Sequence, residues 1–251
     1  MNARFDDKVV LITGGAGGIA TATATAFAAC GATVVLAGRN PDTLAATASG
    51  IAHPGIDWVT ADVTDTDQVA ALVDEVVRRH GGLHVAVNNA GIFGAAAPLA
   101  DLDEKIWHAT LDVNLTGVFL SMKHEIAHMR EHGGGAIVNI SSNIGAHRRL
   151  AGLAAYTASK AAVSALTRAA ALDHIADGIR ITAVSPGATA TPMSMRPGET
   201  PADRDARIAA ATPAGRVGDP AEVAAAVLWL ASDDASYVVG QDLVIDGGAT
   251  A

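Results

Sequence analysis

Short apolar runs rich in β-branched residues alternate along this sequence with longer, alanine-rich stretches of helical character. This alternation indicates repeated βαβ units, in which parallel strands are buried on both faces by the helices that connect them. The predicted strands are Lys8–Thr13, Thr33–Gly38, Ile56–Thr60, Val85–Asn88, Ala136–Ser141, Ile179–Val184 and Asp242–Ile245. The predicted helices include Thr66–Arg79, Ala154–Ala176 and Pro220–Ala231. The expected fold is therefore α/β, a doubly wound seven-stranded parallel sheet with helices on both faces.

The alternation continues without a break from residue 1 to residue 251, so we expect a single domain. Only Pro192–Pro213 has loop character over a long stretch, with proline, glycine, methionine and mixed charges. Sheet and helix patterns follow it, which favours a mobile lid over a linker.

Composition and charge exclude several partners. The net charge of −9 argues against a surface that follows nucleic-acid phosphates, which requires clustered Lys and Arg. No apolar run reaches the ~20 residues that span a bilayer, and no signal-peptide core is present near the N-terminus. The single cysteine, Cys30, forms no internal disulfide. We expect a cytoplasmic protein that binds neither nucleic acid nor membrane.

The first predicted strand ends in a glycine-rich turn that leads into a helix, Thr13-Gly14-Gly15-Ala16-Gly17-Gly18-Ile19-Ala20. Glycines at such a turn let backbone N–H groups approach a pyrophosphate, and the helix N-terminus adds partial positive charge. The turn predicts a dinucleotide site in a Rossmann-type domain. The alternative is a tight strand-to-helix turn that binds nothing.

The second predicted strand ends in Gly38-Arg39, where the adenosine ribose of a dinucleotide would lie. An acidic residue there accepts hydrogen bonds from the ribose of NAD, whereas Arg pairs with the 2′-phosphate of NADP. Arg39 therefore favours NADP(H), with NAD(H) as the second possibility. The alternative is that Arg39 caps the strand or stacks on adenine.

Tyr156 and Lys160 are four residues apart at the start of a predicted helix, so both side chains project from one face. A neighbouring ammonium favours the phenolate, and we expect it to lower the pKa of the phenol toward the range useful for proton transfer. Taken alone, the pair is more often an ordinary half-buried Tyr and exposed Lys. Its context changes that interpretation, because the strand Ala136–Ser141 delivers Ser141 and Ser142 to the sheet edge where α/β ligands bind.

Several motifs in this order resemble the short-chain dehydrogenase/reductase family. They are Thr13-Gly14-x-x-x-Gly18-Ile19, Asn88-Asn89-Ala90-Gly91, Asp112-Val113-Asn114, Ser142 followed by x-x-Gly145, Tyr156-x-x-x-Lys160 and Pro186-Gly187, and the resemblance spans Lys8 to Gly248. One departure is Ala20, where most members have a third glycine.

The resemblance implies roles for residues along the chain. Asn114, Ser142, Tyr156 and Lys160 would be catalytic, with Asn114 holding a water that links Lys160 to solvent. Ser142 is preferred over Ser141 because the catalytic Ser is the second of the pair in this family. The other implied cofactor residues are Asp62, Val63, Asn89, Ala90, Gly91, Pro186, Gly187, Thr189 and Thr191. Two of these motifs have simpler alternatives, a solvated turn acid for Asp62 and a strand-end turn for Asn88-Asn89.

The implied activity is hydride transfer between NADP(H) and a small ketone or secondary alcohol, with Tyr156 as general acid/base. A second possibility is reduction of a 3-oxoacyl group on an acyl-carrier protein, although Leu172 stands where such reductases carry a basic residue. A third, of another class, is a non-catalytic NADP-binding regulatory protein. The histidines show no metal-binding spacing, so no metal is expected.

The substrate is not encoded by any motif. Pocket shape depends on Phe93–Leu99, Asn143–Leu153 and Pro192–Pro213, and the loop after Ser142 is one residue longer than is common in the family. Arg148 and Arg149 in that loop would bind a carboxylate, unless they are simply solvated charges. The family resemblance also implies a homo-oligomer, a tetramer, assembled through helices predicted over Glu104–Arg130 and Ala154–Ala176.

Overall fold

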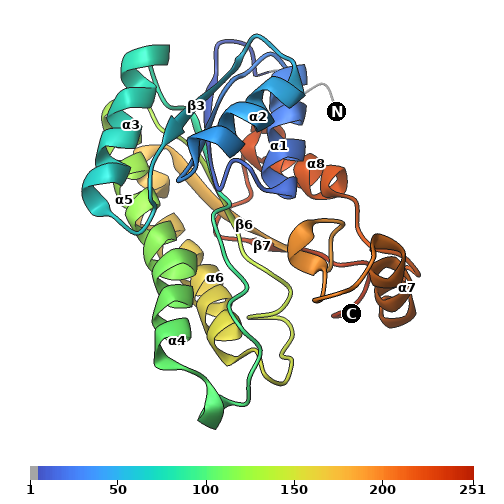
Figure 1. The fold of residues 1–251 in the computed structure, drawn as a ribbon. Coiled ribbons are helices and arrows are strands. Elements are labelled where there is room, and N and C mark those ends of the chain that lie inside the picture. The colour runs from blue at the N-terminus through green and yellow to red at the C-terminus, as the bar shows by residue number, and fades with distance from the viewer. Residues whose placement is uncertain (1–4) are drawn as a thin grey trace.

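The computed structural model describes residues 5–251, and in this part of the chain seven parallel strands form one sheet in the order β3-β2-β1-β4-β5-β6-β7 (Figure 1). The chain winds outward from β1 in one direction and from β4 in the other, so the topology reverses between these two strands. This confirms the predicted doubly wound α/β fold. The strands are β1 Val9–Thr13, β2 Thr33–Gly38, β3 Ile56–Thr60, β4 Val85–Asn88, β5 Gly135–Ile140, β6 Ile179–Pro186 and β7 Asp242–Ile245.

Helices cover both faces of the sheet (Figure 1). The buried side chains of α1, α2 and α8 pack on one face, and those of α3, α5 and α6 pack on the other. Within residues 5–251, no helix has the length and apolarity needed to cross a membrane. The helices are α1 Gly18–Ala29, α2 Pro41–Ile51, α3 Thr66–His80, α4 Glu104–Leu111, α5 Gly117–Glu131, α6 Ala154–His174, α7 Pro201–Ala211 and α8 Pro220–Ala231.

The central strands are buried on both faces, and their side chains alternate between the two layers of helices. In β1, Val10 and Ile12 join the core under α1 and α8, whereas Val9 and Leu11 join the core under α3 and α5. A continuous apolar run is therefore required in β1, as the sequence pattern indicated. The loops that follow the strands therefore start from the ends of a sheet that is packed on both faces.

The seven strands lie within two residues of their predicted bounds. The helix predicted over Glu104–Arg130 is not uniform, because α4 and α5 are joined by a π-helical turn at Asp112–Thr116. The helix predicted over Ala154–Ala176 ends as an α-helix at His174 and continues as a 3-10 turn over Ile175–Asp177. π turns insert one extra residue and often occur at functional sites.

The prediction of a loop over Pro192–Pro213 is wrong in part, because this segment contains α7. The helix begins with a capping box in which Thr200 Oγ1 accepts from Asp203 N at 3.2 Å and Asp203 Oδ2 accepts from Thr200 N at 3.1 Å. Pro201 occupies the first helical turn, where its missing N–H costs nothing. This Thr-Pro-x-Asp signal was readable in the sequence, but the surrounding Pro, Gly and charged residues obscured it.

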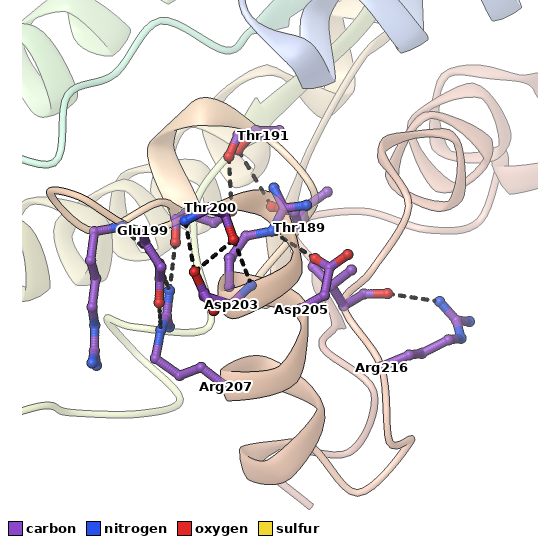
Figure 2. A network of polar contacts seen from close by, with 12 residues as sticks. Thr189, Thr191, Glu199, Thr200, Asp203, Asp205, Arg207 and Arg216 are labelled. Atoms are coloured by element: carbon purple, nitrogen blue, oxygen red, sulfur yellow. Dashed lines mark hydrogen bonds and ion pairs between the residues drawn. The ribbon is translucent and has the colours of Figure 1, made fainter.

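A bidentate ion pair fixes the segment before α7 (Figure 2). Arg207 donates to both carboxylate oxygens of Glu199 at 2.6 and 2.7 Å and to the carbonyl oxygen of Ser194 at 2.9 Å. The hydrogen bonds from Arg207 hold the pKa of Glu199 at about 2. Only Arg204 and Ile208 of α7 are buried, so the helix is attached to the rest of the fold by few side chains.

Candidate active site

The predicted motifs follow strands that are neighbours in the sheet. In the strand register Ile12 of β1 lies beside Val87 of β4, and Asn88 of β4 lies beside Asn139 of β5. Because the strands are parallel, their carboxyl ends lie at one edge, on either side of the point where the topology reverses. The glycine turn, the Asn-Asn-Ala-Gly segment and the Ser141-Ser142 pair therefore meet at this edge.

The glycines of the first turn differ in the space around them. Gly14 has a φ of +65°, and a Cβ on it would lie 2.8 Å from Ala90 Cα; a Cβ on Gly15 would lie 2.7 Å from Leu36 Cβ. Both positions exclude a side chain by close packing. At Gly17 a Cβ would meet only Gly14 O at 3.2 Å and Asn89 Nδ2 at 3.8 Å, so this side of the turn is open.

The open side of the turn suits an anion. Gly17 is the N-cap of α1 and provides no side chain to accept from the first N–H groups of the helix. These N–H groups have no partner inside an α-helix, and the helix dipole adds partial positive charge. The turn therefore has the features of an anion site, and its occupation by a pyrophosphate stays a prediction.

Asn89 braces the glycine turn from the end of β4. Its side-chain amide donates to the carbonyl oxygens of Thr13 at 3.1 Å and Gly14 at 3.2 Å, and its backbone N–H donates to Thr13 Oγ1 at 3.1 Å. From the other side, Thr191 lies close enough that a Cβ on Gly18 would be 2.9 Å from its Cγ2. The structure thus brings Thr191 to the glycine turn.

Thr189 is buried, and its hydroxyl donates to Gly187 O at 3.0 Å. Gly187 N in turn donates to Ile245 O of β7 at 2.8 Å. The segment after β6 is therefore fixed by its own hydrogen bonds and by β7.

The three residues predicted to contact the adenosine, Arg39, Asp62 and Val63, have different surroundings. Arg39 is exposed at the end of β2, and no hydrogen bond or ion pair within residues 5–251 engages its guanidinium group. Asn40, directly after it, caps α2. Asp62 uses its carboxylate in its own turn, accepting from Thr64 N at 3.0 Å and from Thr64 Oγ1 at 2.8 Å, which is the turn role considered as the alternative. Val63 is buried beside Gly117.

Tyr156 and Ser142 are brought together by α6 and the end of β5. Tyr156 is 8% exposed, its ring centroid lies 5.0 Å from that of Phe93, and its hydroxyl faces Ser142. Burial raises the pKa of Tyr156, and the hydrogen bond with Ser142 opposes this increase. The expectation of a pKa lowered by Lys160 is therefore wrong for this structure, because removal of the phenol from water has the largest effect.

Lys160 is buried, and its Nζ donates to the carbonyl oxygen of Ile140 at 2.8 Å. Burial lowers its pKa from 10.5 to about 8. A Cβ on Gly91 would lie 3.5 Å from this Nζ, so the ammonium reaches the segment after β4. Tyr156 and Lys160 thus occupy one face of α6, as their spacing predicted.

Asn114 lies in the π turn and is fully buried. Its Oδ1 accepts from Ile92 N at 2.7 Å, and its Nδ2 donates to Ile92 O at 2.9 Å and to Ser159 Oγ at 3.1 Å. The side chain thus pairs with the backbone after Gly91 and with α6. It connects the two segments that flank Lys160.

The two serines after β5 have separate environments. Ser141 Oγ donates to Lys160 O at 2.9 Å and contacts Ser164 Oγ at 3.1 Å, inside the fold. Ser142 Oγ accepts from Ile144 N at 3.1 Å and faces the Tyr156 hydroxyl. Ser141 therefore makes contacts only inside the fold, whereas Ser142 faces the Tyr156 phenol.

Sequence reasoning missed three residues around the site. Phe93 was noted only as part of a loop, yet its ring packs on Tyr156. His147 and Asp242 carried no signal at all, because they are 95 positions apart and meet only in the fold. No cluster of three His, Cys, Asp or Glu side chains in the described part of the chain has a geometry that could hold a metal ion.

A glycine turn at the reversal point, together with a buried Tyr, Lys and Ser at the same sheet edge, defines the class of dinucleotide-dependent α/β oxidoreductases. Comparison with known proteins narrows this class. The family model described as "Enoyl-(Acyl carrier protein) reductase" matches residues 14–250. A solved short-chain type dehydrogenase/reductase from Mycobacterium ulcerans superposes with a TM-score of 0.92 at 34% identity, covering 98% of this chain and 91% of the other.

Two curated relatives cover nearly the whole length of both chains. One is a cis-4-hydroxycyclohexanecarboxylate dehydrogenase from Sinomonas cyclohexanicum, 45% identical over 100% of each chain. The other is the 3-oxoacyl-[acyl-carrier-protein] reductase FabG of Thermotoga maritima, 41% identical over 98% of each chain. The chain belongs to the short-chain dehydrogenase/reductase family. It is an oxidoreductase that acts on the CH–OH group of alcohols, or on the corresponding ketones, with NAD(P).

Proposed function

We propose that this enzyme transfers a hydride between NADP(H) and a small ketone or secondary alcohol, with Tyr156 as the general acid/base. The observation that carries the proposal is that the Tyr156 and Ser142 hydroxyls face each other beside the buried Lys160, at the edge that also bears the glycine turn. Two hydroxyls placed in this way can both donate to one substrate oxygen on which negative charge develops.

The cofactor would be held by the residues around the topological reversal. Gly14–Ile19 would hold the pyrophosphate, Arg39 the 2′-phosphate, and Asp62 and Val63 the adenine. Asn89–Gly91, Lys160 and Pro186–Thr191 would border the nicotinamide end. When bound, the nicotinamide supplies or accepts the hydride.

Proton transfer is assigned to Tyr156. Because burial raises its pKa, the phenol is protonated at neutral pH, which is the form that donates to a carbonyl oxygen during reduction. Lys160, with its pKa lowered to about 8, gives up a proton near neutral pH more readily than an exposed lysine. Asn114 would hold the water that connects Lys160 to solvent. The same side chain accepts from Ile92 N and donates to Ser159 Oγ, so it fixes the position of the segments on either side of Lys160.

The substrate class that we favour is an alicyclic secondary alcohol or the corresponding ketone. The support is the 45% identity, over full length, to a dehydrogenase named for cis-4-hydroxycyclohexanecarboxylate. Arg148 and Arg149 of the loop after Ser142 would then bind a substrate carboxylate. The segment Pro192–Pro213, with α7, would close over the substrate as a lid.

A second candidate is reduction of an acyl-carrier-bound 3-oxoacyl group, supported by the 41% identity to FabG. The surface of α6 argues against this activity. Leu172 is 77% exposed there, where a basic residue would attract an acidic carrier protein. Turnover of acetoacetyl-carrier protein, compared with 4-hydroxycyclohexanecarboxylate and cyclohexanol, distinguishes the two.

We also infer a homotetramer that buries the exposed Phe119 of α5 and Leu172 of α6.

The test of the proposed chemistry is Tyr156→Phe, which removes the proton donor and keeps the ring that packs on Phe93. We expect kcat/KM for the ketone to fall about 10²- to 10⁴-fold, with NADPH affinity, measured by fluorescence titration, unchanged. Tyr237→Phe is the matched control, because the side chain of this second tyrosine is fully exposed, and it should behave as the wild type.

Full activity of Tyr156→Phe would disprove the assigned role. If the wild type binds NADPH but reduces no ketone in a broad panel, the non-catalytic regulatory protein becomes the better interpretation.

A further inference from the structure

The loop between β5 and α6, residues 143–153, is attached at two points to the segment formed by β7 and the residue that follows it, Asp246. At its start, Asn143 Nδ2 donates to Asp246 Oδ2 at 3.2 Å. Four residues later, His147 Nε2 lies 2.9 Å from Asp242 Oδ2. Internal hydrogen bonds from Arg148 N to Asn143 O at 2.7 Å and from Gly145 N to Arg148 O at 2.9 Å make the intervening residues a compact turn. The position of this turn is therefore set by two carboxylates, that of Asp242 at the start of β7 and that of Asp246 directly after it.

The Asp242 carboxylate is buried, with its side chain only 1% exposed. Besides His147, it accepts from Ser164 Oγ at 2.5 Å and from Ser185 Oγ at 2.6 Å. A buried carboxylate is expensive unless hydrogen-bond donors or a cation compensate for lost hydration. His147 is the partner in this cluster that can also carry positive charge.

The three partners of Asp242 come from three segments that each carry part of the active site. His147 lies in the loop that follows Ser142. Ser164 lies one turn after Lys160 on α6, and Ser185 immediately precedes the Pro186-Gly187 turn. The Asp242 carboxylate therefore links the loop 143–153 to α6, which bears Tyr156, and to β6, which ends at the Pro186-Gly187 turn.

We propose that His147 and Asp242 are positioning residues that hold the loop 143–153 at the distance from α6 that the substrate requires. This inference rests on the proposed function, since it assigns the loop to the substrate side of the site. Neither residue touches the reacting atoms. Ser142 retains its own contacts with Ile144 N and Tyr156, and Asn143 remains bound to Asp246, when the His147 contact is lost.

Because the catalytic groups keep their contacts, the expected effect is on substrate binding. In His147→Ala we expect the KM for the alcohol or ketone to increase about tenfold, with kcat and the KM for NADPH within about twofold of the wild type. His147→Gln, which keeps an N–H donor, should restore the substrate KM to within about threefold of the wild type. In an Asp242→Asn background, His147→Ala should add less than about a twofold change, because its partner is already altered.

The matched control is His174→Ala. His174 Nδ1 lies 2.9 Å from Asp177 Oδ2, and its side chain is 23% exposed, the same as that of His147, but it lies at the far end of α6. Its removal should leave the substrate KM unchanged. A substrate KM that does not move in His147→Ala, or that moves equally in His174→Ala, would overturn the inference.

Hydrogen exchange provides a measurement that does not require turnover. Amides of residues 144–153 should exchange faster in His147→Ala and at the wild-type rate in His174→Ala, and equal protection in both variants would overturn the inference. If the wild type reduces no substrate, the proposed function fails, while the exchange experiment still decides whether His147 holds the loop.

Discussion

At the scale of single residues, α6 carries two buried ionisable side chains whose pKa values shift in opposite directions. Tyr156 and Lys160 share one helical face, yet burial raises the pKa of the phenol and lowers that of the ammonium. Asp62 matches a family position but uses its carboxylate in a local turn. Arg39, in contrast, is exposed without a partner in residues 5–251, so its guanidinium is available to a ligand phosphate.

Arg39 provides the prediction for cofactor choice. Arg39→Asp places a carboxylate where the 2′-phosphate of NADP would lie, so we expect the KM for NADPH to increase about 10- to 100-fold and the KM for NADH to stay the same or fall. Arg39→Lys, which keeps the charge but not the bidentate geometry, should give an intermediate KM for NADPH. Steady-state kinetics measure the KM values for NADPH and NADH. If the ratio of these KM values is unchanged in Arg39→Asp, Arg39 does not contact the cofactor.

At the scale of elements, two helices begin with the same kind of capping box but differ in their attachment to the core. In α8, Asp219 and Glu222 form the box, and six of the helix residues are buried, including Val223, Val227 and Leu230. In α7, Thr200 and Asp203 form the box, but only Arg204 and Ile208 are buried. The two helices should therefore respond differently to loss of a cap.

We expect removal of either cap to cost about 1 kcal/mol of helix stability. Asp219→Ala should lower the melting temperature of the whole protein, because α8 cannot unfold without opening the core that it shares with α1. Thr200→Ala should leave the melting temperature almost unchanged and increase hydrogen exchange only in residues 195–211. Calorimetry and exchange mass spectrometry measure the two effects, and a global loss of stability in Thr200→Ala would argue against a lid that moves independently.

At the scale of the whole molecule, one buried acid links stability to pH. Glu125 on α5 is 1% exposed; its Oε2 accepts from Asn88 Nδ2 at 3.0 Å, and Asn88 also donates to Asn139 Oδ1 at 3.0 Å. Glu125 Oε1 and Asn88 Oδ1 are buried without a hydrogen-bond partner among the described residues. Burial raises the pKa of Glu125 from 4.5 to about 7, and a proton on the carboxyl supplies a donor to this cluster of acceptors.

The sign of the effect follows from the raised pKa. The folded state holds the Glu125 proton more tightly than the unfolded state, so the contribution of Glu125 to stability is complete below pH 4.5 and is lost as the pH rises to about 7. The loss from this group is on the order of 3 kcal/mol. Glu125→Gln cannot ionise, so its stability relative to the wild type should increase between pH 5 and pH 8.

Chemical denaturation at both pH values measures this difference. Glu75→Gln is the control, because Arg78 and Arg79 hold the pKa of Glu75 at about 2 and Glu75 does not titrate in this range. If the free energy of unfolding changes equally with pH in the wild type and in Glu125→Gln, Glu125 does not control the pH dependence of stability.

Local sequence patterns were sufficient for the sheet, for the glycine turn and for the relative placement of Tyr156 and Lys160. Each of these depends on residues close together in the chain, through strand periodicity, turn chemistry and the helical repeat. The choice of Ser142 over Ser141 came from the family resemblance, and the structure places the two hydroxyls accordingly. The helix α7 was missed although its capping box is a local signal.

Only the tertiary structure decided which distant groups meet and how far each is removed from water. Asp242 is 95 positions from His147 and 78 from Ser164, and no periodicity predicts that these side chains share one carboxylate. The direction of the Tyr156 pKa shift and the buried acid at Glu125 depend on the loss of hydration that packing imposes. Solvation is a property of the assembled fold, and for this reason the sequence determined the elements and the reactive groups, whereas the structure determined their protonation and their partners.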